Sequence, residues 1–192
     1  MELRDIHALY AYNRWANLRM LSAVEKVTPK RFTATVQSSF SSLQESVFHI
    51  FGAEWIWLKR WTGASPRANQ PNPKASWETW AGLRANGVAP PQELGTVAEL
   101  KAFCDSIEQE RQEFLSGLTE NVLQAPLSYT DMAGTPFSAP LFEQMQHVVN
   151  HGSYHRGQVT TLLRQAGADP ITLDMLYFFR EEREKAAGAA SE

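Results

Sequence analysis

Three histidines recur at four-residue intervals near the C-terminal end of the sequence: His147, His151 and His155. The residues around them have the 3–4 spacing of apolar side chains that is typical of an amphipathic helix. Side chains four residues apart then lie one above the other on the same helix face, and two imidazoles in this arrangement can bind one metal ion. The segment therefore predicts either a metal site or hydrogen-bonded core histidines.

The apolar pattern of this helix favours one histidine pair as the pair that faces inward. Its expected core stripe consists of Leu141, Met145, Val148, Gly152, Val159, Leu162 and Ala166. At about 100° per residue, His155 falls about 35° from the middle of the stripe and His151 about 75°, whereas His147 falls more than about 110° away. His147 should thus border solvent or a neighbouring helix, about 12 Å along the axis from His155. We expect His151 and His155 to be the inward pair.

Length and composition place the chain among globular domains of ordinary size. It has 192 residues, of which 43% are hydrophobic, so a single core is expected. The net charge of −3 argues against a nucleic-acid or anionic-membrane partner. No apolar run approaches the ~20 residues of a membrane-spanning helix. Because an acidic N-terminus runs straight into the first helical pattern, we expect no secretory leader. With one cysteine, Cys104, the chain cannot form an internal disulfide, and we expect a cytoplasmic protein.

Hydrophobic periodicity predicts four long amphipathic helices. They are expected over about residues 4–27, from Ser41 or Ser42 to Thr62, from Thr96 to about 118 and from Pro140 to Gly167. Capping residues mark three of the starts: Ser41 with Gln44 or Ser42 with Glu45, then Thr96 with Glu99, and finally Ser138 before Pro140.

Shorter features lie between and after these helices. A proline-rich connection over residues 64–95 is expected to carry a short helical turn at 76–84. Alternating residues around a glycine predict a small β-hairpin over 127–137, and a short helix over 172–183 precedes a tail that should fray. The whole pattern predicts an all-α four-helix bundle, a fold whose core often holds metal sites.

A ferritin-like dinuclear site does not fit the spacing of the acidic residues, because it needs Glu-x-x-His motifs on two helices. Glu45 and Glu143 each precede a histidine by four residues rather than three. A metal site in this chain would therefore hold one ion.

Three segments of the sequence resemble the DinB family, in order and over nearly the whole chain. They are Tyr12-Asn-Arg-Trp-Ala-Asn17, His49-Ile-Phe-Gly-Ala-Glu-Trp55 and His151-Gly-Ser-Tyr-His155-Arg-Gly-Gln158. We expect one such domain over residues 1–185, followed by a frayed tail over 186–192. The resemblance implies an up-down-down-up bundle in which 64–95 is the crossover. It also implies a divalent metal ion held by His49, His151 and His155. Without the resemblance, His7 would be an alternative to His49 as the third ligand, because it is expected near the inner face of the first helix.

Three imidazole ligands leave coordination positions open, as in a catalytic metal site, and they suit Zn, Ni or Fe. The resemblance further implies a small-molecule substrate, because relatives include metal-dependent hydrolases and S-transferases that use a low-molecular-weight thiol. We therefore expect an enzyme that activates water or such a thiol. One alternative is a non-catalytic stress-response protein or homodimer scaffold that the metal stabilises, and another is a metal-free bundle with core histidines.

Several further residues have two interpretations each. Glu45, Asn13, Asn17 and Gln158 are either partners of the histidine rings or plain capping and structural residues. Arg156 is expected to pair with an acidic neighbour. A solvated helix face is expected to hold Glu108, Glu110, Arg111 and Glu113, and a core face Phe40, Val47, Phe51, Trp55 and Leu58. A pocket or a homodimer contact is expected to hold Trp57, Trp77 and Trp80.

Overall fold

The computed structural model describes residues 1–63, 94–130, 135–169 and 171–189. This part of the chain is mostly helical, with one small two-stranded sheet. The long helices are α1 (Leu3–Val24), α3 (Leu43–Trp61), α5 (Val97–Ser116) and α7 (Leu141–Gln165). The shorter elements are α2 (Pro29–Phe32), α6 (Glu120–Gln124), β1 (Pro126–Thr130), β2 (Pro136–Pro140) and α8 (Met175–Ala189). The predicted turn at 76–84, with Trp77 and Trp80, lies outside the described residues.

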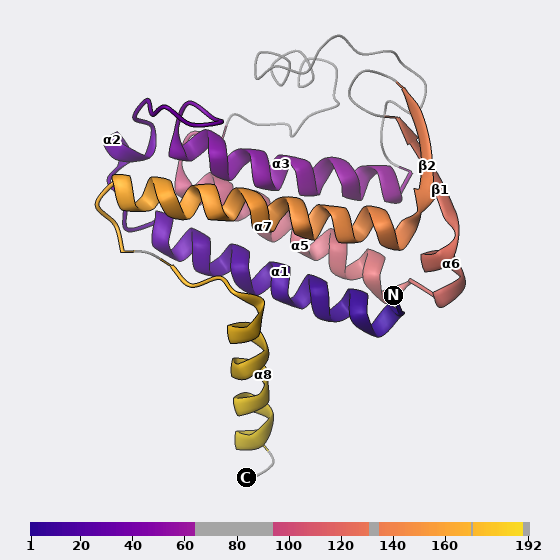
Figure 1. Ribbon diagram of the computed structural model, residues 1–192. Helices are drawn as coiled ribbons and strands as arrows, with labels where there is room; N and C mark the ends of the chain where they lie inside the picture. The colour runs from indigo at the N-terminus through magenta and orange to yellow at the C-terminus, as the bar shows by residue number, and fades with distance from the viewer. Residues whose placement is uncertain (64–93, 131–134, 170, 190–192) are drawn as a thin grey trace.

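The four long helices lie side by side along their lengths (Figure 1). Helix α7 contacts α1 and α3, and α5 contacts the same two helices from the other side. This packing agrees with the mostly helical fold expected from the sequence. It also brings α3 and α7 into contact along a long common edge, and that edge carries the histidines.

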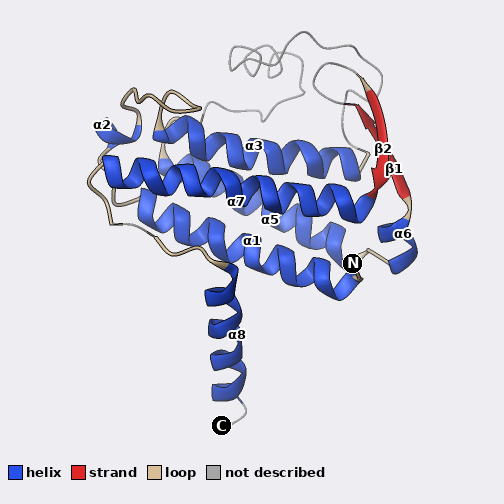
Figure 2. Ribbon diagram, viewed as in Figure 1, coloured by secondary structure: helices blue, strands red, loops and turns tan. Residues whose placement is uncertain are grey.

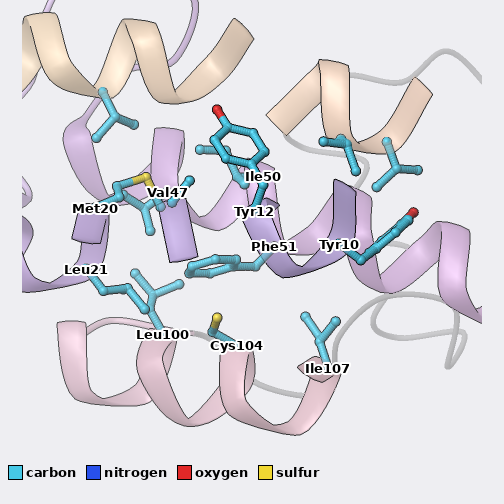
Figure 3. Packing of buried hydrophobic residues seen from close by; sticks show 14 of the residues in the cluster. Tyr10, Tyr12, Met20, Leu21, Val47, Ile50, Phe51, Leu100, Cys104 and Ile107 are labelled. Atoms are coloured by element: carbon cyan, nitrogen blue, oxygen red, sulfur yellow. The ribbon is translucent and has the colours of Figure 1, made fainter. Parts of the chain in front are cut away.

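The core follows the predicted apolar stripes. Figure 3 shows buried side chains from three of the helices meeting in the interior, with Phe51 of α3 between Leu21 of α1 and Ile107 of α5. One expectation of the second helix was wrong, because Phe40 is only half-buried and does not belong to the core, whereas Trp55 is half-buried and packs against it. Phe40 precedes α3, so the helical period does not govern where its side chain packs.

The helix starts agree closely with the capping predictions. Thr96 Oγ1 accepts from the Glu99 backbone N–H (3.2 Å), and the Glu99 carboxylate accepts from the Thr96 N–H (2.8 Å), which completes the predicted box. Ser42 caps α3, although the Glu45 carboxylate accepts from the Ser41 N–H rather than from that of Ser42. Ser138 does not cap α7, because it lies within strand β2.

The predicted hairpin and final helix are both present. Strands β1 and β2 pair antiparallel, with Leu127 opposite Ala139, at the end of the bundle where α7 begins (Figure 2). Helix α8 runs to Ala189, past the predicted end at residue 183, and projects from the bundle (Figure 1). Buried Phe178 and a hydrogen bond from Trp15 Nε1 to Glu181 (2.8 Å) hold its base to α1. Among the described residues, no helix combines the length and hydrophobicity needed to cross a bilayer.

Candidate metal centre

His49 of α3 and the pair His151 and His155 of α7 meet between the two helices. The ring centroids are 4.9 Å apart for His49 and His151, 4.5 Å for His49 and His155, and 4.4 Å for His151 and His155. One ring nitrogen from each residue lies within 4.8 Å of the other two. The structure therefore brings together the three histidines named from the sequence.

The geometry of these nitrogens fits a shared metal ion. The Nε2 atoms of His49 and His151 are 3.1 Å apart. Ligands at ~2.0–2.1 Å from a tetrahedral ion are roughly 3.3 Å from one another, so this pair is already at a chelating distance. All three rings are half-buried, and nitrogens that face one another there need a common proton or a common cation. The donor set is one that divalent transition metals favour.

The electrostatic environment keeps the rings in the form that binds metals. Burial, followed by the neighbouring rings of His155 and His151, lowers the pKa of His49 to about 3. Burial, followed by the neighbouring rings of His155 and His147, lowers the pKa of His151 to about 4. Burial also lowers the pKa of His155. The three imidazoles are thus neutral at pH 7, as ligation requires.

These lowered pKa values predict a pH dependence of stability in the metal-free chain. In the unfolded chain, histidines become protonated as the pH falls below their ordinary pKa of 6.5. In the folded chain, His49 becomes protonated only near pH 3 and His151 only near pH 4. The free energy of unfolding should therefore fall as the pH drops below 6.5. Urea titrations of chelated protein at several pH values will measure this. The variant His49→Gln should show a shallower fall, and an equal fall would contradict the cluster as its source.

Gln158 holds the ring of His155 in place, as one of its two sequence interpretations suggested. Its Oε1 lies 2.9 Å from His155 Nδ1, while its Nε2 donates to Ser39 Oγ (3.1 Å). In the neutral ring, Nδ1–H donates to this oxygen, which leaves Nε2 as the acceptor nitrogen. The contact therefore selects the tautomer that directs a lone pair toward His49 and His151.

Replacing Gln158 by leucine is expected to weaken metal binding by about 10–100-fold, the usual effect of losing a group that orients a ligating histidine. Glu at position 158 still offers an acceptor to Nδ1, so Gln158→Glu should retain most of the affinity. Competition with a metal-sensitive dye gives both constants. Equal affinities of the two variants would show that Gln158 does not orient the ring.

Two aromatic side chains border the histidine cluster. The Phe40 ring lies 4.4 Å from that of His49 and 5.5 Å from that of His155, so it covers one side of the site. The ring of Tyr154 lies 4.9 Å from that of His155, and its side chain is largely exposed. Neither role was predicted, because Phe40 had been placed in the core and Tyr154 follows no apolar stripe.

The other histidines are not members of this cluster, although the ring of His147 lies 6.0 Å from that of His151. His7 is exposed, so its expected place near the inner face of the first helix was wrong. His147 is exposed too, as its angle predicted, and its ring packs against Trp57 (5.4 Å). Glu45 caps the start of α3, and none of the described hydrogen bonds joins it to His49.

A buried polar network lies beside the site and explains the two asparagines. The Glu54 carboxylate accepts from Asn13 Nδ2 and Asn17 Nδ2 (2.9 Å each) and from Arg111 Nη1 (2.6 Å). The oxygens of both asparagines in turn accept from Arg156 Nη1 (2.8 Å each). The asparagines therefore bridge a carboxylate to a guanidinium, rather than contacting a histidine.

Two expectations about charges in this network were wrong. Arg111 and Glu108 are buried and paired with each other, so they do not belong to a solvated face. Arg156 reaches no acidic side chain directly among the described residues, because the asparagines stand between it and Glu54. Burial would raise the pKa of Glu54, but Arg111 and the asparagine amides hold it below its usual value.

Gly152 leaves the space that this network occupies. A Cβ at this position would lie 2.8 Å from Arg156 Nη1 and 3.3 Å from Asn13 Oδ1. We expect Gly152→Ala to lower the free energy of unfolding by about 1–3 kcal/mol through overpacking. Gly157→Ala is the matched control, since a Cβ at position 157 would meet nothing within 4 Å. Alanine there should raise the free energy of unfolding by about 0.5–1 kcal/mol, because it favours the helix more than glycine does. Chemical denaturation will show whether the two effects have opposite signs.

The fold and the site together define a helical protein with a three-histidine centre between two bundle helices. The DinB family model matches residues 3–186, and the chain belongs to the DinB family. It is 26% identical over 188 residues to "Protein DinB" of Bacillus subtilis, which covers 93% of this chain and 96% of that protein.

Solved structures of DinB-like proteins have the same fold. One from Bacillus subtilis superposes with a TM-score of 0.58 at 14% identity, covering 85% of this chain and 95% of the other. Another, from Bacillus cereus, gives a TM-score of 0.51 at 18% identity, covering 85% and 91%. At these identities the likeness concerns the fold alone.

Proposed function

We propose that this chain is a metal-dependent enzyme in which His49, His151 and His155 hold one divalent transition metal ion, Zn, Ni or Fe. The observation that carries the proposal is the convergence of three neutral imidazoles within 4.8 Å, a group that no Cys, Asp or Glu joins in the described part of the chain. A closed structural site needs four protein ligands, whereas three leave a position for a reactant. The proposed reactions are hydrolysis and transfer of a small thiol to an electrophile.

The side chains around the cluster orient the ligating histidines and contact the substrate, and they do not transfer protons. When bound, the ion lowers the pKa of a water molecule or thiol in the open position. The tautomer of His155 is fixed by Gln158, so the ligand nitrogens are oriented before the ion arrives. Phe40 and the exposed Tyr154 offer aromatic surface to the organic part of a substrate.

The proposal includes the up-down-down-up helix order of the family. It is supported by Figure 1, in which α1 and α7 run in one direction and α3 and α5 run in the other. This order places His49 of α3 beside His151 and His155 on an antiparallel neighbour.

The test is turnover by protein purified without chelator or affinity metal and then loaded with Zn, Ni or Fe in turn. A panel of esters and amides probes hydrolysis, and electrophiles mixed with cysteine or glutathione probe thiol transfer. Turnover that disappears with chelation and in His155→Ala would support the enzyme. One metal ion per chain, a sharp fall in melting temperature on chelation and no turnover would instead support the non-catalytic, metal-stabilised protein.

A further inference from the structure

A row of aromatic rings leads away from the candidate metal centre along the edge where α3 and α7 meet. The ring of His147 lies 6.0 Å from that of His151, and the ring of Trp57 lies 5.4 Å from that of His147. Tyr129 of β1 continues the row, with its ring 4.9 Å from that of Trp57. The hairpin that carries Tyr129 lies at the end of the bundle where α7 begins (Figure 2). We call His147, Trp57 and Tyr129 the aromatic row.

The aromatic row lies on the side of the metal centre that Phe40 does not cover. Phe40 contacts His49 and His155, and it precedes the first turn of α3. Along α7, His147 comes one turn before His151, whereas His155 comes one turn after it. A ligand held between the three histidines can therefore extend past His151 toward the row.

The α3 side of this path is lined by a small side chain. Ala53 lies one turn after His49 and one turn before Trp57, on the same face of α3. It is half-buried and adds only a methyl group to that face. No large side chain of this α3 face thus stands between the metal centre and Trp57.

The rings of the row keep surface that a ligand can contact. His147 is exposed, and Trp57 and Tyr129 are half-buried. Phe137 of β2 stacks on Tyr129 at 5.8 Å and is 47% exposed, so it extends the same surface. Aromatic rings pack well against the faces and edges of other rings. An aryl group is the ligand that such a surface fits best.

The charge beside the row restricts that aryl group further. The Arg60 guanidinium lies over the ring of Trp57 (4.5 Å) and that of Tyr129 (5.5 Å), and it donates to the Thr130 carbonyl (2.8 Å). A cationic ligand at these rings would be repelled by Arg60. Arg60 is itself engaged by the two rings and the carbonyl, so we assign no anion to it. The surface suits an uncharged ring.

We propose that the aromatic row binds an uncharged aryl group of the substrate while the reacting group of the same molecule lies between the three histidines. This inference rests on the proposed function, because it takes the reaction to occur at His49, His151 and His155. It narrows the substrate class to compounds in which a short linker separates an aryl ring from the reacting atom by about one helical turn, or ~5.4 Å.

Hydroxamates test the row without turnover, since their two oxygens chelate a divalent metal ion whatever group they carry. 3-Phenylpropanohydroxamate places a ring beyond a two-carbon linker, and propanohydroxamate is the same probe without the ring. Titration calorimetry with the full, Zn-loaded chain gives both affinities, and the ¹⁵N–¹H resonance of the Trp57 indole reports where the ring binds.

We expect the phenyl compound to bind at least about tenfold more tightly than propanohydroxamate and to shift the Trp57 resonance, because its ring packs against the row. Equal affinities of the two compounds would overturn this inference alone. Failure of both to bind would overturn the proposed open metal position and this inference with it.

Two variants and a matched control locate the bound ring. Trp57→Leu and His147→Ala should each lower the ratio of the two affinities at least about threefold. Trp55→Leu is the control, because Trp55 is also half-buried and also lies near a cation, Lys59 Nζ at 5.8 Å, but points about 160° away around α3. It should keep the ratio of the wild type.

His147→Ala separates ligand binding from a structural effect on the hairpin. Trp57 packs against Tyr129, so its replacement can also displace β1, whereas His147 is exposed on α7. A fall of the ratio in both variants would support the subsite. An unchanged ratio in His147→Ala, or an equal fall in Trp55→Leu, would overturn it.

Discussion

Replacing His151 and His155 together by alanine is expected to reduce the metal content from about one ion per chain to none. A single remaining imidazole, His49, cannot compete with water and buffer for a divalent ion, since two of the three ligand nitrogens of the cluster are gone. The measurement is elemental analysis of protein purified without chelator or affinity metal, beside the wild type. Any metal-dependent turnover should disappear with the ion.

The control for this loss is His147→Ala, one helical turn before His151. His147 lies outside the cluster and is exposed, so its replacement should leave the metal content near one per chain. His49→Ala tests the ligand from the other helix and should also lose the ion. A double variant that retains one equivalent would refute the assignment, and a wild type that holds no metal after reconstitution would make these residues ordinary interior histidines.

Helical periodicity predicts two of the three ligands of this centre, and it does not predict the third, which comes from a second helix. His151 and His155 lie on one helix, so their common face follows from the 3.6-residue repeat alone. His49 comes from α3. Which face of α3 packs against α7 depends on the tertiary structure and not on the periodicity of either helix. The apolar stripe of α3 left His49 open, and the resemblance to the DinB family selected it over His7. The structure then placed the three rings together.

Helix starts were predictable for a similar reason, since capping depends on residues close in sequence. Thr96 and Glu99 form their box through contacts three residues apart, and Ser42 caps α3 in the same way. Phe40 lies just outside a helix, where no period applies, and its place over His49 depends on how the preceding loop folds back. Capping rules therefore predict where the helices that carry the site begin, but they do not predict that Phe40 packs against the histidines.

The charged interior was the largest omission. Glu54 follows Val47 and Phe51 along the buried stripe of α3, and Arg111 follows Leu100 and Ile107 along that of α5. A charged residue within an apolar stripe was thus visible in the sequence. Its acceptance in the core depends on partners from other helices, because Glu54 is satisfied by two asparagines of α1 and an arginine of α5. Pairings of that kind cannot be deduced from the period of one helix.

Glu54→Gln is expected to lower the free energy of unfolding by about 3–5 kcal/mol, the usual cost of removing one member of a buried ion pair. The substitution keeps the shape of the side chain but replaces an acceptor by an amide that donates. The Glu54 carboxylate accepts three hydrogen bonds, and both Arg111 and, through the asparagines, Arg156 depend on its charge. Two buried guanidinium groups would then share only the charge of Glu108, so stability should fall steeply.

Glu110→Gln provides the comparison for this effect. Glu110 also pairs with a cation, since Lys59 Nζ lies 2.6 Å from its carboxylate, but the two side chains are 33% and 23% exposed. Solvent screens such a pair, so its loss should cost less than about 1 kcal/mol. Urea unfolding of the wild type and both variants, at constant pH and metal content, gives the two differences. If Glu54→Gln costs no more than Glu110→Gln, the buried network contributes little to stability, and the asparagine bridges are a consequence of the fold rather than a support of it.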